Sequence, residues 1–287
     1  MNKKITRSVC KATQVNIGYQ LMPALFSLLL MNEYQNNDQW MWVEIVMTVC
    51  NGTMMMLIYR KQCPDYFVPV KKMRLKTFMS FVCLLALAQI IALGIQFCMR
   101  LSLQMSPVEF IKSMGNVSQI TLPFVIFTAV VAPVFEEIVF RGMGLQELSK
   151  HSHLLAIGIG SVLFGCAHHS VYTIPFALMS GILFSYVYLN YSIYASMALH
   201  FFNNGIFAVL FSAVALYIPG MAYVQWGILF IFAIFGGVYL YKNRIYIRDY
   251  MKVHSVEVGG YSSAFHSKLF WTYLIFVLVM STFTIFS

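Results

Sequence analysis

Two adjacent carboxylates, Glu136 and Glu137, lie with Arg141 inside a stretch that otherwise has the composition of a membrane-buried helix. Apolar residues begin at Ile120 and continue almost without interruption to Phe140. An ionised group at that depth costs several kcal/mol unless it is paired or faces a polar cavity, so charges inside a span indicate a functional site. A single acidic residue is explained about as well by an interhelical salt bridge. The pair, with an arginine four residues later, favours the functional interpretation.

Two further polar clusters occur in later hydrophobic stretches. The first is His168 with His169, and the second comprises His200, Asn203 and Asn204. A lone His or Asn in a membrane span usually makes an interhelical hydrogen bond. His169 next to His168 is explained as well by the end of a helix. Three such clusters on neighbouring spans nevertheless favour one shared site over three independent hydrogen bonds.

The helical period sorts the members of each cluster. Residues four apart share a helix face, and three pairs have this spacing: Glu137 with Arg141, Phe164 with His168, and His200 with Asn204. Glu136 is rotated by about 100° from Glu137 and therefore faces elsewhere. With a rise of about 1.5 Å per residue, the depths of the three clusters overlap only loosely. A tilted fifth helix would bring them together in the inner half of the membrane.

The composition indicates a helical membrane protein. Of 287 residues, 60% are hydrophobic and only 10% are charged, against about 25% charged in a soluble domain. The mean hydropathy is +0.73. The net charge of +9 does not indicate nucleic-acid binding, because the basic residues cluster between apolar spans in the positive-inside pattern. The six cysteines are scattered without a Cys-x-x-Cys pair, so neither a disulfide framework nor a thiolate metal site is indicated.

We expect an all-α, polytopic transmembrane bundle of eight or nine spans with a cytoplasmic N-terminus. The basic loop 60–76 is the strongest orientation signal, and the positive-inside pattern places it in the cytoplasm. The N-terminus lies on the same side, because two spans separate it from this loop. No cleavage site follows the first apolar stretch, which we interpret as a retained span. The expected spans are 17–31, 40–59, 77–99, 120–145, 154–169, 174–191, 193–217, 224–241 and 269–286. Segment 101–119 is expected to be an external loop with a short interfacial helix, and 261–268 a polar linker. We divide the chain into N-terminal spans and loops (1–119), a catalytic core (120–210) and C-terminal spans (211–287).

The motifs Glu136-Glu137-x-x-x-Arg141, Phe164-x-x-x-His168 and His200-x-x-x-Asn204 occur in this order, each in an expected transmembrane helix. Together they resemble the CPBP family, the CAAX protease and bacteriocin-processing intramembrane endopeptidases, also called the Abi family. The eukaryotic CAAX prenyl endopeptidase of the endoplasmic reticulum belongs to this family. The resemblance covers residues 120–207, and the remaining spans match only in being hydrophobic helices.

The resemblance implies an intramembrane endopeptidase and a role for each motif residue. Glu136, with His168, would activate a water molecule as general base, and His200 and Asn204 would stabilise the oxyanion of the tetrahedral intermediate. Glu137 and Arg141 would hold the site together. This chemistry is self-consistent, because amide hydrolysis by water needs a general base and prepositioned donors for the developing oxyanion. The sequence offers no Ser or Cys nucleophile beside a base, and Cys166 points off the face of His168.

The sequence leaves open whether the site binds a metal ion. The chain has no His-Glu-x-x-His zinc motif. Glu136, His168 and His200 could form a His₂Glu zinc site, in which case Glu137 becomes the candidate base. The family is commonly labelled metalloprotease, yet its glutamate–histidine site also resembles a metal-free, water-activating one. We therefore expect no tightly bound metal and no other cofactor, with zinc as the alternative.

We expect a multi-pass protein of a bacterial plasma membrane, with the lipid bilayer and a peptide or membrane protein as partners and no nucleic acid. Candidate substrates are bacteriocins, pheromones and CAAX-like peptides, and the oligomeric state is left open. The alternative is a non-catalytic bacteriocin self-immunity protein, or a transporter that uses the buried charges as an ion relay. A transporter would predict an internal repeat with broken helices in both halves. The sequence contains no such repeat.

Overall fold

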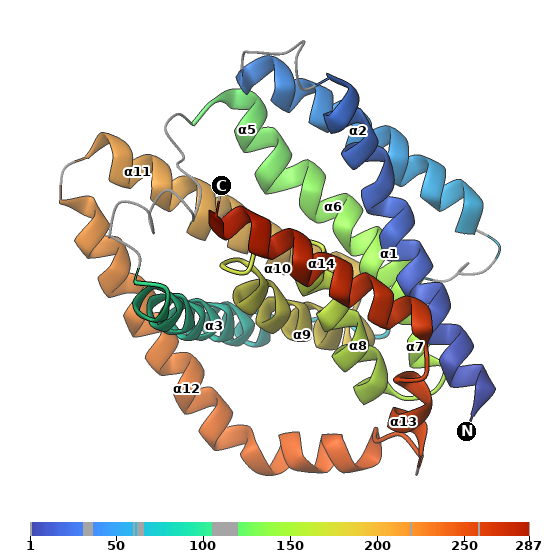
Figure 1. Ribbon diagram of the computed structural model, residues 1–287. Helices are drawn as coiled ribbons and strands as arrows, with labels where there is room; N and C mark the ends of the chain where they lie inside the picture. The colour runs from blue at the N-terminus through green and yellow to red at the C-terminus, as the bar shows by residue number, and fades with distance from the viewer. Residues whose placement is uncertain are drawn as a thin grey trace.

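A computed structural model describes residues 2–30, 37–59, 61, 66–104, 120–218, 220–257 and 259–286. For residues 26–30, 37 and 282–286 the description covers the backbone only. Every regular element in these ranges is helical, and no strand occurs among them. The fold class predicted from composition, an all-α bundle of apolar helices, is confirmed (Figure 1).

The chain folds into nine helical runs and one short connecting helix within the described ranges. The first three runs are α1 (Lys3–Leu30), α2 (Asn37–Tyr59) and α3 (Leu75–Ser102). The fourth run is continuous and comprises α5 (Leu122–Ile126), η1 (Phe127–Val131), α6 (Ala132–Glu136), η2 (Glu137–Leu145) and α7 (Gln146–Ser149). Next come α8 (His153–Cys166) and α9 (Ile174–Asn190), followed by a second composite run of α10 (Ile193–Phe201), η3 (Phe202–Leu210) and α11 (Phe211–Tyr217). The chain continues with α12 (Met221–Val253), the short α13 (Gly260–Ala264) and α14 (Lys268–Phe286).

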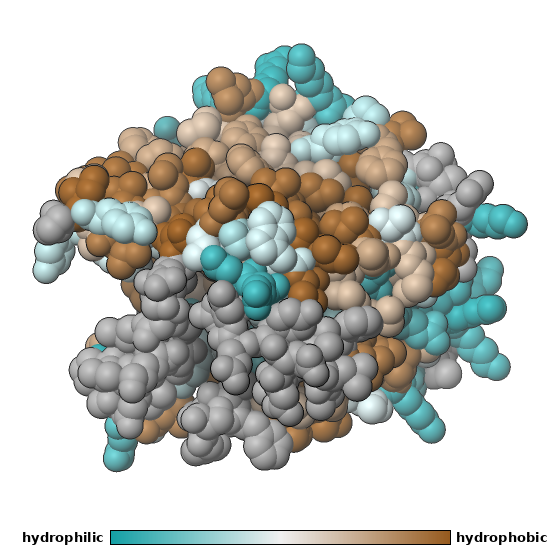
Figure 2. Space-filling view, turned by 90° about the horizontal axis from the view of Figure 1, so that it is seen from above, coloured by the Kyte–Doolittle hydropathy of each residue, from teal (hydrophilic) through white to brown (hydrophobic). Residues whose placement is uncertain are grey.

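Five of the described helical runs are long and apolar enough to cross a membrane, at 38–59, 75–102, 122–149, 193–217 and 221–253. The apolar helices 153–166, 174–190 and 268–281 are shorter. At about 1.5 Å per residue, α8 reaches roughly 21 Å, which is less than the ~30 Å hydrocarbon thickness. Hydrophobic side chains form a broad area on the face seen in Figure 2, and a bilayer would cover such a surface. The number of spans and the side of the N-terminus stay predictions.

Two helices extend beyond the predicted spans, and one lies in a predicted linker. α1 begins at Lys3 rather than near residue 17, because Ile5, Val9 and Ala12 recur at helical spacing and are buried. α12 continues to Val253 rather than ending near 241, so the basic residues that follow the apolar part lie on the same helix. The predicted linker 261–268 contains most of α13. The expected interfacial helix falls in 105–119, outside the described residues.

The helices that hold the predicted site lie in the centre of the bundle. α6 and η2 pass alongside α1 and α2, while α8, α9 and α10 form the neighbouring group (Figure 1). Local signals start these helices where they are needed. Ser152 caps α8 by accepting a hydrogen bond from the backbone N–H of Leu155 at 3.2 Å, and Ser192 caps α10 by accepting from Ala195 at 3.0 Å. Both helices therefore begin on a fixed register, which sets where their polar side chains point.

Candidate active site

Two π-helical segments carry most of the polar residues of the candidate site. η2 begins at Glu137 and includes Arg141, and η3 includes Asn203 and Asn204. π-helical turns are rare and frequently mark functional sites, because the wider turn re-aims side chains and frees backbone groups. Sequence analysis assumed the α-helical period throughout, so these segments were not predicted.

A third π-helical segment, η1, explains a backbone contact of the site. The N–H of Ala132 bonds to the carbonyl of Phe127, five residues back. By the same pattern the carbonyl of Thr128 would accept from residue 133, but Pro133 has no N–H. The Thr128 carbonyl instead accepts a hydrogen bond from Asn204 Nδ2 at 3.0 Å. Pro133 thus leaves a backbone acceptor to which the second composite helix is attached.

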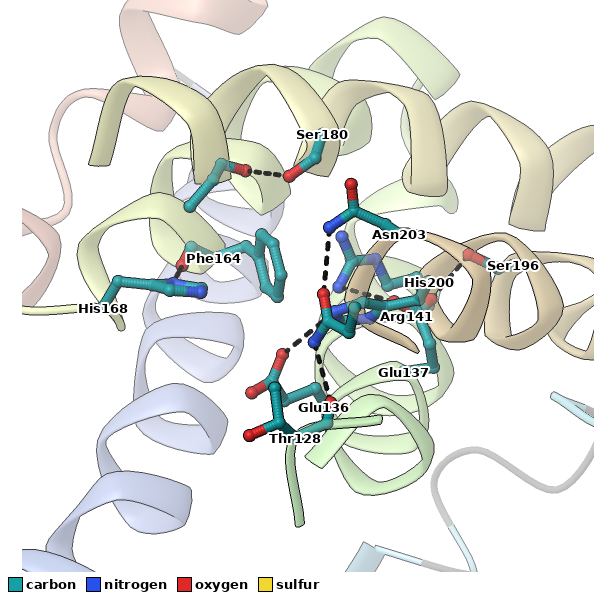
Figure 3. A network of polar contacts seen from close by, with 12 residues as sticks. Thr128, Glu136, Glu137, Arg141, Phe164, His168, Ser180, Ser196, His200 and Asn203 are labelled. Carbon is teal, nitrogen blue, oxygen red and sulfur yellow. Dashed lines mark hydrogen bonds and ion pairs between the residues drawn. The ribbon is translucent and has the colours of Figure 1, made fainter. Parts of the chain in front are cut away.

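Glu137 is fully buried and accepts contacts on both carboxylate oxygens (Figure 3). Arg141 Nη1 lies 3.2 Å from Oε1, and His200 Nδ1 lies 3.0 Å from the same oxygen. The Ser196 hydroxyl donates to Oε2 at 2.6 Å. A carboxylate held by two hydrogen bonds and one ion pair from two helices is a fixed anchor and offers no free edge to a water molecule. The predicted Glu137–Arg141 pair is present.

Arg141 is buried with this partner but without an aligned hydrogen bond. Its guanidinium nitrogens lack hydrogen-bond partners among the described residues, so the contact with Glu137 is an ion pair alone. The guanidinium carbon instead lies 4.1 Å from the ring centroid of Phe164 and 5.3 Å from that of Phe184. Desolvated cation–π contacts of this kind stabilise a cation by up to about 2 kcal/mol. Two aromatic faces therefore take the place of the missing hydrogen bonds.

Glu136 has a different environment from its neighbour, as the helical rotation predicted. Its side chain is 21% exposed, against 0% for Glu137. It lines a cavity of about 330 Å³ together with Tyr19, Glu44 and His169. Its Oε2 lies 3.7 Å from His200 Nε2. Glu136 is therefore the carboxylate of the pair that a substrate or a water molecule can reach.

His200 lies between the two glutamates. Nδ1 faces Glu137 and Nε2 faces Glu136, while the ring of Phe184 stacks on the imidazole at 4.5 Å. An ionised Glu137 can only accept hydrogen bonds, so Nδ1 carries a hydrogen. Nε2 is then an acceptor in the neutral imidazole and a donor only in the imidazolium form. This hydrogen-bond pattern links any donor role of His200 to its protonation.

His168 lies apart from the other polar residues, and its predicted place in a membrane helix was wrong. α8 ends at Cys166, so His168 falls in the following turn, where its side chain is exposed. Its Nδ1 lies 3.0 Å from the carbonyl of Phe164, which can only accept, so Nε2 carries the free lone pair in the neutral ring. No hydrogen bond or ion pair joins His168 to Glu136 within the described chain, and the ring of Phe164 packs beside the imidazole (Figure 3).

His169 has a left-handed backbone with φ of 50°, just past the end of α8. This agrees with the interpretation of the second histidine as a marker of a helix end. Its position also places it on the wall of the cavity that Glu136 lines. No sequence pattern distinguishes His169 from His168 as the residue that faces this cavity.

The two asparagines are linked by consecutive hydrogen bonds. Asn203 is buried, and its Nδ2 donates to Asn204 Oδ1 at 2.9 Å. This contact orients the Asn204 amide, whose Nδ2 then donates to the Thr128 carbonyl. An amide nitrogen has two hydrogens, so the second hydrogen of Asn204 stays available to a substrate oxygen.

The residues considered as zinc ligands do not form a metal site in this arrangement. Among the described residues, no group of three or more His, Cys, Asp or Glu side chains is placed to hold one ion. Glu136 and His200 approach each other, whereas His168 lies beyond Phe164. Since the three donors of the zinc alternative do not converge, we derive no step of the chemistry through a metal.

Three contributors were missed from sequence. Ser196 lies four residues before His200, so the helical spacing used for the other pairs would have found it. Thr128 contributes its carbonyl, which could not be found from sequence, because in an α-helix Pro133 would free the carbonyl of Ala129 instead. Phe184 stacks on His200 from α9 and carries no signal that separates it from the many other phenylalanines of the chain.

Fold and site together define a helical membrane protein with an anchored glutamate–arginine pair and a second, accessible glutamate beside histidine and asparagine donors. Residues 118–206 match the family model described as Type II CAAX prenyl endopeptidase Rce1-like, which belongs to the CPBP family. The resemblance inferred from the three motifs is thereby confirmed, and the match of this segment supports an intramembrane protease role. No curated protein and no solved structure matches the chain.

Proposed function

We propose that this protein is an intramembrane endopeptidase in which Glu136, together with His168, activates a water molecule for attack on a peptide bond. The observation that carries the proposal is the difference between two adjacent carboxylates. Glu137 is saturated by Arg141, Ser196 and His200, whereas Glu136 borders a cavity and has a free carboxylate edge. Of these two glutamates, Glu136 is the one placed to take a proton from a water molecule.

The remaining polar residues fit the other needs of amide hydrolysis. As the water attacks the scissile carbonyl carbon, its proton passes to Glu136 and the carbonyl oxygen becomes an oxyanion. The second amide hydrogen of Asn204 and the Nε2–H of protonated His200 can donate to that oxyanion. The proton held by Glu136 then passes to the leaving amine as the C–N bond breaks. The resemblance assigns the orientation of that water to the Nε2 lone pair of His168, and this role requires the turn after α8 to bring the imidazole closer to Glu136 than it lies in this structure.

The substrate class follows from the resemblance and from the position of the cavity. The cavity lies where α1, α2 and the first part of the composite helix meet, since its wall includes Tyr19, Trp40 and Phe127. An extended peptide segment held by the membrane could reach Glu136 there. We assign a bacteriocin, a pheromone or a CAAX-like peptide as the substrate and a bacterial plasma membrane as the location.

Substrate capture tests the proposal. The protein termini in membranes that contain wild-type protein would be compared by mass spectrometry with those from membranes that contain Glu136→Gln. The exposed Glu257→Gln serves as a charge-matched control. We expect a set of cleaved termini that is lost in Glu136→Gln and kept in Glu257→Gln at equal protein amount. Unchanged cleavage in a folded Glu136→Gln variant would contradict the assignment of the base.

A further inference from the structure

A second cavity, of about 530 Å³, lies away from the candidate active site and shares no lining residue with the cavity at Glu136. Its walls come from the first part of α3, the first part of α8, α9 and the second half of α12. The lining is apolar and aromatic, and tyrosines are concentrated in it: Tyr186, Tyr191, Tyr239, Tyr246 and Tyr250. We call this space the tyrosine cavity.

α12 forms one wall of the tyrosine cavity, and it is attached to the rest of the bundle at one point on each side of that wall. At the first point it meets α3 at Gly236, where a Cβ would overlap the backbone carbonyl of Cys83. At the second point the carbonyl of His254 accepts hydrogen bonds from the Ser152 hydroxyl at 2.6 Å and from the N–H of Leu154 at 3.3 Å. Between these points α12 bends and passes beneath α9 and α8 (Figure 1). Between these two anchors α12 forms one wall of the cavity and contacts α9 through the side chains of Tyr246 and Tyr250.

Three of the five tyrosine hydroxyls of the cavity wall have protein partners. The Tyr250 hydroxyl lies 3.1 Å from Asn190 Nδ2 and 3.1 Å from His153 Nδ1. The hydroxyls of Tyr186 and Tyr246 lie 3.3 Å apart. Because these groups satisfy one another, the wall offers mainly carbon to an occupant. An apolar chain fits such a lining better than a polar molecule.

A line of three cations borders the cavity. Arg244, Arg248 and Lys252 are spaced four apart, so they share one face of α12, and all three are exposed. They line a surface pocket that adjoins the tyrosine cavity through Leu154 and Ile247, which line both. Asp249 offsets part of this charge, because its Oδ1 lies 3.8 Å from Arg248 Nε. The line as a whole stays cationic.

We propose that the tyrosine cavity and this cationic line form a binding site for an anionic phospholipid. One acyl chain would occupy the cavity, and the phosphate of the headgroup would contact Arg244, Arg248 and Lys252. Both ends of the site are needed for this ligand: a neutral lipid gains nothing from three cations, and a soluble phosphate gains nothing from an apolar cavity. Basic pockets between membrane helices are known to bind anionic headgroups.

Binding to the purified full chain in detergent tests the charge requirement. Native mass spectrometry would compare phosphatidylglycerol with phosphatidylcholine of the same acyl chains. We expect wild-type protein to bind phosphatidylglycerol roughly tenfold or more tightly than phosphatidylcholine. The triple variant Arg244→Gln, Arg248→Gln and Lys252→Gln should lose this preference. The control Lys3→Gln, Lys4→Gln and Arg7→Gln removes the same charge from exposed positions on α1 and should keep it.

A cavity-filling variant tests the place of the acyl chain. Ile182 lines the cavity and is 40% exposed, so a tryptophan there fills space without disturbing the core. Ile182→Trp should weaken binding of both lipids, and glycerol phosphate without acyl chains should not compete. Equal affinity of wild-type protein for the two lipids would overturn the proposal, as would equal losses in the two triple variants or unchanged binding in Ile182→Trp. Peptidase activity does not enter any of these measurements.

Discussion

Glu137 and Arg141 are each stabilised by the other and by different further groups. Glu137 has donors from Ser196 and His200, while Arg141 has the ring faces of Phe164 and Phe184. Removing one member of a buried ion pair leaves the other charge uncompensated, whereas removing both can be nearly neutral. The two charges of the pair therefore stabilise the site by neutralising each other. Breaking the pair should lower the free energy of unfolding more than it affects the catalytic step directly.

Glu137→Gln should lower the free energy of unfolding by about 3–5 kcal/mol, because Arg141 stays buried without its counter-charge. Adding Arg141→Met should recover part of that loss. Glu136→Gln leaves the pair intact and serves as the control, with a small change expected. Thermal and denaturant unfolding in one detergent would measure the wild type, the single variants Glu137→Gln, Arg141→Met and Glu136→Gln, and the double variant. Single-variant losses that simply add in the double variant would show that the two residues are not coupled.

Asn204→Ala should lower the turnover number by roughly 10²–10³-fold with little change in substrate affinity, the usual loss for one oxyanion donor. Asn203→Ala is the matched comparison. It removes only the contact that orients the Asn204 amide, so we expect a smaller loss. Steady-state kinetics on a captured substrate would separate turnover from affinity. A loss confined to affinity in Asn204→Ala would move this residue from the oxyanion to substrate binding.

At the residue level, contacts between residues of one helix could be predicted from the sequence, whereas contacts between residues of different helices were predicted less well. The contacts of Glu137 with Arg141 and of Phe164 with His168 follow from a spacing of four, and both are present. The separation of His168 from Glu136 depends on where α8 ends and on which side of Phe164 the turn passes. Hydropathy falls over residues 167–173, which are more polar than α8, but this fall gives neither the last residue of the helix nor the path of the turn.

Among the helices, the crossing of α3 and α12 depends on a single missing side chain. Gly236 is buried where a Cβ would overlap the carbonyl of Cys83, while a Cβ on the adjacent Gly237 would meet nothing within 4 Å. Backbone atoms cannot move aside as a flexible side chain can. The two neighbouring glycines therefore differ in their roles. Packing requires Gly236, whereas Gly237 only lowers the intrinsic stability of the helix.

Gly236→Ala should lower the free energy of unfolding by about 1–3 kcal/mol, the usual cost of overpacking. Gly237→Ala should leave stability unchanged or raise it by up to about 1 kcal/mol, because alanine is the better helix former. Parallel unfolding curves of the two variants in detergent would measure this contrast. Similar destabilisation of both would mean that the helices do not cross at Gly236.

The π-helical segments are the elements least accessible from sequence. A helical-wheel argument assumes 3.6 residues per turn, which fails in η1, η2 and η3. Only η1 has a recognisable cause, since Pro133 removes the N–H that the Thr128 carbonyl would otherwise use. Helix ends were misplaced for a different reason. Hydropathy reports the part of a helix that lies in the membrane, so the polar ends of α1 and α12 were not assigned to helices.

Across the whole molecule, hydrogen bonds join segments that the positive-inside pattern places on one side of the membrane. The Asn2 N–H donates to Ser263 Oγ at 2.8 Å, tying the N-terminus to the segment before α14. The Ser8 hydroxyl donates to Glu147 at 3.0 Å, and the N–H of Val70 donates to the Tyr191 carbonyl at 2.8 Å. All of these segments are expected to be cytoplasmic if the nine helical runs alternate in direction from a cytoplasmic N-terminus.

Cysteine labelling of intact cells tests this arrangement. In a background with the six native cysteines replaced by alanine, single cysteines would be placed at Lys72, Leu103 and Ser255, which are all exposed. Lys72 and Ser255 border the basic segments and should react with a membrane-impermeant maleimide only after the membrane is permeabilised. Leu103 follows α3 and should react in intact cells. A reporter fused after residue 287 should be external if α14 spans the membrane, which separates nine spans from eight.

Labelling of Lys72→Cys in intact cells, with protection of Leu103→Cys, would mean that the bundle has the opposite orientation. The cationic line of α12 would then face the outer leaflet, and the positive-inside pattern would not have set the topology.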